Sequence, residues 1–200
     1  MKNILLAVCM LAAPASLLGQ TEQGTWEFSV SGNFGVVSGS TEITDATGTT
    51  TLDQESQGYL AVALRPGFYV VDGLTVEPEL LWTAVEKNPP CFSLSGNLAY
   101  NFDFLPSKVL GFVLAGYGRG NSIPLFERLF YRASEKLDIS ILNFGGGVKF
   151  MLGERVALRA EYRYQHYSQE QSVSALGVTT TMKTAQNYHN LFCGLSFFVR

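Results

Sequence analysis

Eight stretches of the chain alternate polar and apolar residues with a period of two, and this pattern restricts the possible folds more than any other feature. Successive side chains of a β-strand point to opposite faces, so each stretch predicts a strand with one apolar and one polar face. In residues 157–169, ALRAEYRYQHYSQ, Leu158 and Tyr162 fall on one face, while Arg159 and Glu161 fall on the other. The eight predicted strands are residues 25–37, 57–71, 74–84, 91–102, 109–118, 138–152, 157–169 and 185–199.

The connections between these predicted strands alternate in length. Short turns follow the second, fourth and sixth strands, as in VDGL at 71–74, whereas longer polar segments follow the first, third, fifth and seventh. Tight turns at one end and long loops at the other are typical of up-and-down barrels of the outer membrane. The sequence therefore predicts an all-β fold, an eight-stranded antiparallel transmembrane barrel with short periplasmic turns, long extracellular loops and both termini in the periplasm.

Three segments of the predicted barrel have a less definite pattern. Residues 38–57 are rich in Gly, Ser, Thr and Asp and predict a mobile loop, and the Thr-rich and Ser-rich residues 170–184 predict another. Residues 120–137 fit either a short helix over the barrel mouth or a continuation of the two neighbouring strands. The predicted strand 109–118 is apolar on both faces, so the sequence does not orient it.

Composition agrees with a chain that is largely removed from water. Charged residues make up 16% of it, against roughly 25% in soluble domains. The net charge of -3 excludes the basic surface that a nucleic-acid partner requires. Residues 1–20 combine a lysine with a short apolar core and predict a Sec signal peptide, cleaved between about residues 15 and 20. Residues 21–200 then form the barrel domain.

Two kinds of barrel fit this pattern, and they differ in which face is inside. A soluble exported barrel that binds a small apolar ligand buries its apolar face, whereas an outer-membrane barrel exposes that face to lipid. Opposite charges on the polar faces and three glycines, Gly145 to Gly147, level with Arg159 and Glu161, favour the membrane barrel. So do aromatic residues near the strand ends, which suit interfacial girdles: Trp26, Trp82, Phe102, Phe150, Tyr164, Tyr167 and Phe197.

An eight-stranded lumen has room for side chains but for no channel. We therefore expect a filled interior in which the charges of the polar faces pair. The predicted ion network consists of Arg65, Glu77, Glu79, Arg159, Glu161 and Arg163.

The last ten residues, LFCGLSFFVR, resemble the assembly signal of outer-membrane barrels, with Gly194, Phe197 and Val199 at its key positions. Val199 replaces the usual terminal aromatic residue, and Arg200 extends one place further. Together with the eight-strand rhythm, the chain resembles the outer-membrane β-barrel domain family that includes the small A and X barrels. The resemblance implies a monomer in outer-membrane lipid and lipopolysaccharide, inserted by the barrel-assembly machinery. It also implies a non-enzymatic structural or surface role, with loops that meet an unknown surface ligand.

His166 and Ser168 fall on the apolar face near the extracellular end of their strand. This H-x-S is similar to the lipid A 3-O-deacylase family, whose barrels carry a Ser-His-acid site on the outer wall. The resemblance implies Ser168 as nucleophile and His166 as general base. Gln169 replaces the asparagine usual after the serine, and residues 172–186 contain no Asp or Glu, which leaves Glu170 as the substitute acid. The alternative is an interfacial histidine and serine that meet headgroups or water.

Cys91 and Cys193 are compatible with one disulfide or with two separate thiols, and their expected places at a strand start and in mid-strand favour separate thiols. No Cys or His cluster has the spacing of metal ligands, and we expect no metal and no cofactor.

Overall fold

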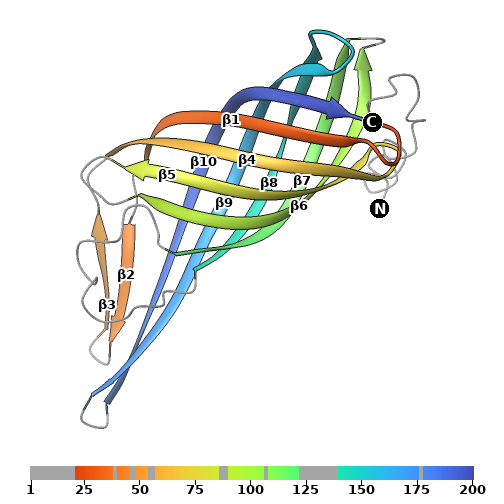
Figure 1. Cartoon of the computed structure of the whole chain (residues 1–200). Helices are drawn as coiled ribbons and strands as arrows, with labels where there is room; N and C mark the ends of the chain where they lie inside the picture. The colour runs from red at the N-terminus through yellow and green to blue at the C-terminus, as the bar shows by residue number, and fades with distance from the viewer. Residues whose placement is uncertain are drawn as a thin grey trace, which may run out of the picture.

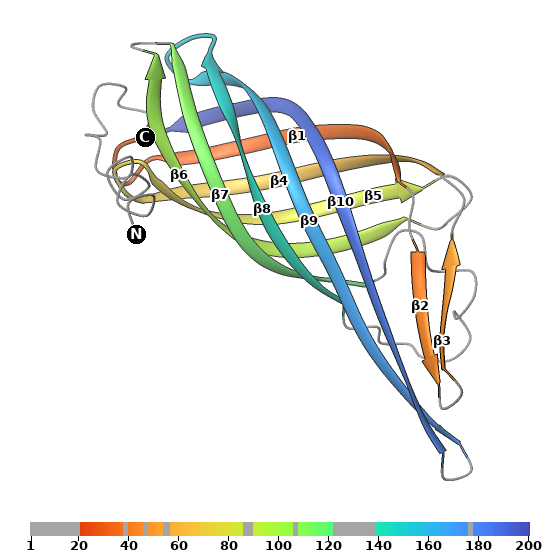
Figure 2. The ribbon, with the colours of Figure 1, turned by 180° about the vertical axis from the view of Figure 1, so that it is seen from behind.

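The computed structural model describes residues 21–37, 40–45, 48–53, 57–85, 90–105, 108–121, 139–175 and 178–200. Within these residues, eight antiparallel strands close into a barrel in the order β1-β10-β9-β8-β7-β6-β5-β4 (Figures 1 and 2). The barrel strands are β1 (Trp26–Val37), β4 (Gln57–Val71), β5 (Leu74–Val85), β6 (Cys91–Leu105), β7 (Val109–Gly120), β8 (Ile139–Met151), β9 (Val156–Ala175) and β10 (Val178–Val199). The predicted eight-stranded barrel is confirmed. The described part of the chain contains no helix that is long and apolar enough to cross a membrane.

One end of the barrel carries the tight turns, and we name it the turn end; the opposite end is the loop end. At the turn end, Asp72 and Gly73 connect β4 to β5. Gly73 has a φ of 78°, a left-handed backbone conformation that glycine adopts without strain. The backbone N–H of Gly73 donates to the carbonyl of Thr21 over 2.9 Å. The first described residues and the last strand residue, Val199, therefore lie together at the turn end (Figure 1).

The barrel has its apolar side chains outside and its polar side chains inside. Leu98 and Phe144 are 55% and 51% exposed on the outer wall, whereas Arg65 is 2% exposed and Lys149 is fully buried in the lumen. This inversion is the arrangement of a barrel that faces lipid. It excludes the soluble exported barrel that the sequence left as an alternative.

Strand β7, which the sequence could not orient, turns Leu110, Phe112 and Leu114 into the lumen and Val113 and Tyr117 outward. Its inward apolar side chains are exceptions to the polar lining.

Two predicted loops are strands instead. Residues 40–45 and 48–53 form a separate antiparallel hairpin of β2 (Ser40–Asp45) and β3 (Gly48–Asp53). The predicted loop 170–184 is mostly strand as well, because β9 and β10 remain paired as far as Ala175 and Val178. Both segments are rich in the β-branched residue Thr, which favours strands even without alternating polarity.

Since β8 pairs with β9 only as far as Ser168, the last residues of β9 and the first of β10 form a two-stranded arm beyond the barrel at the loop end (Figure 2).

Tyr167 is a further correction, because it is 4% exposed inside the barrel rather than in an outer girdle. Tyr167 is four residues after Arg163 on β9, so both side chains point to the same face, the lumen. The alternation of the strand, and not its position near a strand end, decides where this ring lies. Other members of the predicted girdles, such as Trp26 and Phe150, are exposed on the outer wall. Residues 1–20 and 122–138 lie outside the described residues, so the signal peptide and the conformation of the third long connection stay predictions.

The lipid-facing wall can be tested with a charge at its mid-height. Leu98 lies at the middle of β6, whereas Leu152 follows β8 at the turn end. Leu98→Arg should lower the free energy of unfolding by roughly 2–4 kcal/mol, and Leu152→Arg by less than about 1 kcal/mol, because the cost of a charge falls toward the interface. Urea unfolding in phospholipid vesicles, followed by tryptophan fluorescence, measures both. Equal losses would contradict a membrane around this wall.

Candidate functional site

Eight charged side chains form one network inside the barrel, and none is more than 2% exposed. Four are carboxylates and four are cations, so the network is neutral as a whole. Its members are Glu27 of β1, Arg65 of β4, Glu77 and Glu79 of β5, Lys149 of β8, and Arg159, Glu161 and Arg163 of β9.

The structure brings the six predicted network residues together. Arg159 Nη2 lies 3.0 Å from Glu77 Oε2 and 2.9 Å from Glu161 Oε2. Arg163 donates to Glu79 Oε2 over 2.6 Å and to Glu161 Oε1 over 2.7 Å. Arg65 pairs with Glu79 and lies 3.3 Å from Glu161. Each carboxylate of this group thus meets at least one guanidinium, which buried charges need in order to persist.

Glu27 and Lys149 complete the network, and sequence reasoning did not include them. Lys149 Nζ donates to Glu27 Oε2 over 2.6 Å and to Asn101 Oδ1 over 2.7 Å. Both residues stand on the polar face of their strands, so the alternation itself contained the signal. Alternation within a strand does not place the two residues beside each other, because β1 and β8 are far apart in the sequence and are not neighbours in the barrel.

Two aromatic rings, Phe112 and Phe192, lie against cations of the network. The Arg159 guanidinium carbon lies 4.4 Å from the centre of the Phe112 ring, and Lys149 Nζ lies 5.2 Å from it. The Arg163 guanidinium carbon likewise lies 5.2 Å from the centre of the Phe192 ring of β10. A cation over a ring face is attracted by the ring quadrupole. This attraction accounts for the inward ring of Phe112 among the charged side chains of the lumen.

Glycines make room for the long side chains. Gly145 and Gly147 face the lumen from β8, and Gly116 does so from β7. A Cβ on Gly147 would collide with the backbone of β9 at Ala160 and Glu161, and one on Gly116 would collide with the side chain of Asn97. The sequence predicted this use of the β8 glycines but not that of Gly116.

An uncharged layer lies above the network, and we name it the amide belt. Its members are Asn33, Tyr59, Asn97, Asn143, Gln165 and Asn190. Asn143 donates to Asn97 over 3.1 Å, Gln165 donates to Asn143 over 2.9 Å, and Asn190 donates to Gln165 over 2.8 Å. Asn190 Oδ1 then accepts from Asn33 over 2.6 Å and from the Tyr59 hydroxyl. The belt crosses the lumen with its side chains hydrogen-bonded to one another.

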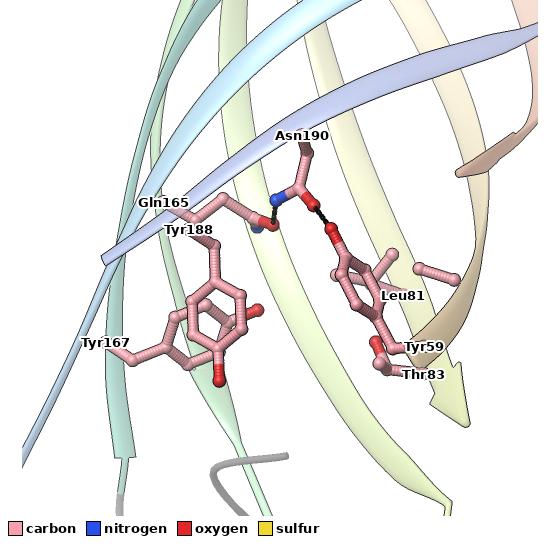
Figure 3. Close-up of a pocket in the computed structure, with 8 residues that line it drawn as sticks. Tyr59, Leu81, Thr83, Gln165, Tyr167, Tyr188 and Asn190 are labelled. Carbon is pink, nitrogen blue, oxygen red and sulfur yellow. Dashed lines mark hydrogen bonds between the residues drawn. The ribbon is translucent and has the colours of Figure 1, made fainter. Parts of the chain in front are cut away.

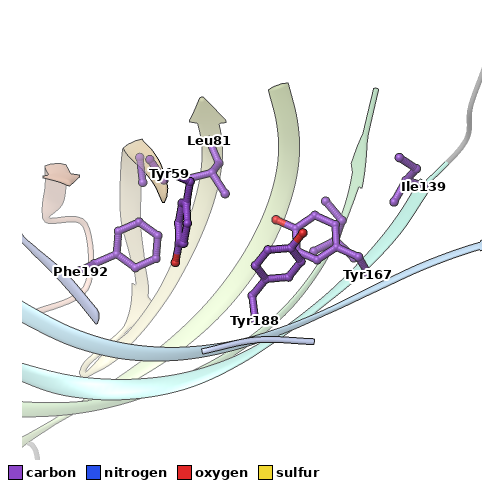
Figure 4. Close-up of a cluster of buried hydrophobic side chains, with 9 residues drawn as sticks. Tyr59, Leu81, Ile139, Tyr167, Tyr188 and Phe192 are labelled. Atoms are coloured by element: carbon purple, nitrogen blue, oxygen red, sulfur yellow. The ribbon is translucent and has the colours of Figure 1, made fainter. Parts of the chain in front are cut away.

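Rings and aliphatic side chains pack toward the loop end of the belt, and the group includes Tyr59, Leu81, Ile139, Tyr167 and Tyr188 (Figure 4). The ring centres of Tyr167 and Tyr188 are 4.9 Å apart.

A small pocket, with room for about one water molecule, lies between this group and the belt (Figure 3). It is lined by Tyr59, Ala61, Leu81, Thr83, Gln165, Tyr167, Tyr188 and Asn190. None of these lining residues carries a formal charge at neutral pH.

His166 and Ser168 are half-buried on the outer wall of β9. The structure adds Asn187 of β10, whose Oδ1 lies 2.7 Å from His166 Nδ1 and accepts a hydrogen bond of 2.7 Å from the Tyr164 hydroxyl. The sequence could not locate Asn187, because its place opposite His166 depends on the β9–β10 register. Glu170, the substitute acid, lies in β9 opposite Lys183, and the structure describes no side chain there.

The predicted assembly signal lies in β10 at the turn end. Phe197 and Val199 face outward, 44% and 52% exposed, and Gly194 packs so closely against β1 that a Cβ would collide with the backbone at Val30 and Ser31. Cys91 is buried whereas Cys193 is exposed, and no disulfide joins them.

Comparison with known proteins places this geometry in a family. The family model described as outer membrane protein beta-barrel domain matches residues 4–191. No curated protein sequence matches.

Three similar solved structures are all less than 25% identical, and the first two of them bear on the fold alone. OprG from Pseudomonas aeruginosa is 17% identical, with a TM-score of 0.51, over 90% of this chain and 99% of that chain. The outer membrane protein AlkL is 17% identical, with a TM-score of 0.52, over 94% and 95%. Neisserial surface protein A is 13% identical, with a TM-score of 0.47, over 88% and 97%.

Removing one cation from the network should be costly. Arg159→Met keeps much of the side-chain volume but leaves Glu77 and Glu161 short of a partner, so the free energy of unfolding should fall by about 3–5 kcal/mol. Arg200→Met removes an ion pair with Glu22 in which the arginine side chain is 67% exposed, and it should cost less than about 1 kcal/mol. Urea unfolding in vesicles compares them. If the two variants are equally stable, the network does not hold the barrel together.

Proposed function

The chain belongs to the outer membrane protein β-barrel domain family, and from that premise we propose that it is a non-enzymatic surface protein of the bacterial outer membrane. In this role the barrel is a rigid, filled platform. It stabilises the envelope or displays its loops for adhesion to a surface ligand.

The filled lumen is the observation that carries this proposal. Eight balanced charges, rings over the cations and a continuous amide belt occupy the interior from the turn end to the pocket. A solute that passed through the lumen would have to break several buried ion pairs. The free energy of breaking them is far larger than the free energy that contacts between the solute and the lumen would supply. A barrel closed in this way is suited to anchoring and display rather than to conduction.

The orientation in the membrane is part of the same proposal. Short turns face the periplasm in outer-membrane barrels and long connections face outward, so the turn end, with the first and last described residues, is the periplasmic end. The export route is Sec, with residues 1–20 removed, and the barrel-assembly machinery inserts the chain through its C-terminal strand. The inserted protein is a monomer in contact with outer-membrane lipid and lipopolysaccharide.

The two-stranded arm of β9 and β10 gives this proposal its test. Replacing residues 170–183 with Asn-Gly leaves Gln169 and Thr184 to close the hairpin, and these two residues are already opposite each other. The shortened barrel should fold and keep its heat-dependent shift in gel mobility, since those residues pair only within the arm. Cells that express the shortened barrel should adhere several-fold less than wild-type cells to fibronectin, laminin, collagen or polystyrene. Their resistance to detergent should equal that of wild-type cells.

Cells that lack the protein are the control for both readouts. If they match wild-type cells in adherence and in detergent resistance, neither part of the surface role stands.

A second candidate function, a lipid A-modifying esterase, is favoured by one observation, the contact between His166 and Asn187. An asparagine oxygen only accepts hydrogen bonds, so His166 Nδ1 carries the hydrogen and leaves the lone pair on Nε2. This is the tautomer that a general base requires. Ser168 Oγ would attack the ester carbonyl, His166 would take the serine proton and return it to the leaving alcohol, and water would release the acyl chain.

The esterase candidate predicts a specific pattern of lipid A acylation. Cells that express the wild-type protein should lose an acyl chain, Ser168→Ala should abolish the loss, and Asn187→Ala should reduce it. Asn187→Asp should restore it, because a carboxylate orients the imidazole at least as well as an amide. Mass spectrometry of isolated lipid A measures all four. Identical profiles for wild-type and Ser168→Ala cells, beside clear deacylation in a positive control, eliminate the esterase.

A further inference from the structure

One edge of the arm has no neighbouring strand among the described residues. Strand β8 pairs with β9 no further than Ser168, whereas β9 continues to Ala175. Residues 169–175 therefore have β10 on one side and, in the part of the chain that the structure describes, no strand on the other (Figure 2). We name residues 169–175 the free edge. Strand β10 differs, because β2 packs against it.

The free edge lacks the features with which proteins usually protect the edge of a sheet. Such edges are blocked by lysine, by proline, by a bulge or by a covering segment. The sequence of the free edge, QEQSVSA, contains neither lysine nor proline. Its pairing with β10 runs without a register shift from Gln169 to Ala175, so it contains no bulge. An extended segment can therefore add to it through backbone hydrogen bonds.

The free edge is complementary to itself in charge. If two copies pair antiparallel over the whole of it, Ser172 lies opposite Ser172 of the second copy, and Glu170 lies opposite Ser174. Like charges directly opposite each other destabilise a strand pair, and this register keeps the two glutamates apart. Glu170 and Lys183 are the only charged residues of the arm, residues 169–184, so two arms do not repel each other through net charge.

Symmetry decides where the second copy lies. Two barrels in one membrane are related by an axis along the membrane normal, which leaves both arms pointing outward and makes their free edges parallel. Two barrels in facing membranes are related by an axis between the membranes, which makes the free edges antiparallel. Antiparallel pairing is slightly more stable per residue than parallel pairing, and it gives the register described above. A second copy in a facing membrane therefore fits the free edge better than a neighbour in the same membrane.

The size of the free edge sets the strength of such a contact. A pair of seven-residue strands buries much less than the roughly 1,200 Å² of a stable protein interface. One pair of arms is thus a weak contact. Many arms on two facing surfaces act together, however, and multivalency multiplies the strength of the contact without further interactions.

We propose that the free edge of β9 is a site of self-association, through which copies of this chain in facing membranes pair by antiparallel strand addition. The partner is a second copy of the chain, and the contact is made by the backbone of residues 169–175. This inference rests on the proposed display of the loop end outside the cell. It requires neither a matrix ligand nor the esterase.

Cross-linking between nanodiscs that hold one barrel each tests the pairing, because such barrels meet only through the parts that project from the discs. Ser172→Cys should form disulfide-linked dimers under mild oxidation, since its counterpart lies opposite. Glu170→Cys should link to Ser174→Cys but not to itself. Thr181→Cys is the matched control, because Thr181 lies opposite Ser172 on β10, in the other strand of the arm. It should give only the background level of dimers.

Lysine substitutions test the same register through charge. Ser172→Lys places two positive charges opposite each other and should weaken association about two- to five-fold. Ser174→Lys places a lysine opposite Glu170 at both ends of the pair and should strengthen association by about the same factor. Sedimentation velocity of the nanodiscs measures both, and the heat-dependent gel shift identifies variants that fold.

The unsubstituted protein is the blank for cross-linking, since Cys91 is buried and Cys193 lies on the lipid-facing wall. The proposal is overturned if Ser172→Cys forms no more dimers than Thr181→Cys, or if the two lysine variants associate equally. It is also overturned if Glu170→Cys links to itself as readily as to Ser174→Cys, because the glutamates would then lie opposite each other. None of these results bears on the surface role itself, which the adherence of cells that lack the protein tests separately.

Discussion

The structure depends on one constraint, that every charge placed in the lumen must meet an opposite charge there. An unpaired buried ion costs several kcal/mol, and the four carboxylates and four cations of the network balance one another. The pairs also join strands that are not neighbours in the wall. Arg159 of β9 meets Glu77 of β5, and Lys149 of β8 meets Glu27 of β1. The network therefore braces the barrel across its interior as well as neutralising it.

The second constraint is space, because an eight-stranded lumen has room only for side chains. Side chains of different kinds fill it in successive layers. Charges fill the part near the turn end, where Gly147 lets the backbone of β9 approach β8. Amides form the next layer, and phenol rings stand above it near the loop end. The charged zone closes the barrel to ions, while the neutral zone leaves a small pocket lined by phenol rings and amides. The proposed surface role rests on the first zone.

Strand positions could be predicted closely, because alternation is a local property of the chain. The prediction failed where strands are formed by β-branched residues without alternating polarity, as in β2, in β3 and in the arm of β9 and β10. It left β7 without an orientation because both of its faces are apolar. Contacts with other strands settle that orientation, since the ring of Phe112 lies against Lys149 and Arg159.

The sequence by itself determined the number of barrel strands, the polarity of their two faces and six of the eight charges of the lumen, because each of these follows from residue spacing within a strand or across a short turn. Only the tertiary structure decided the pairing of Glu27 with Lys149, the place of Asn187 beside His166 and the point at which β1 leaves β10. Those features depend on the register and curvature of strands far apart in the chain. A shift of one residue in register would turn every side chain of a strand to the opposite face.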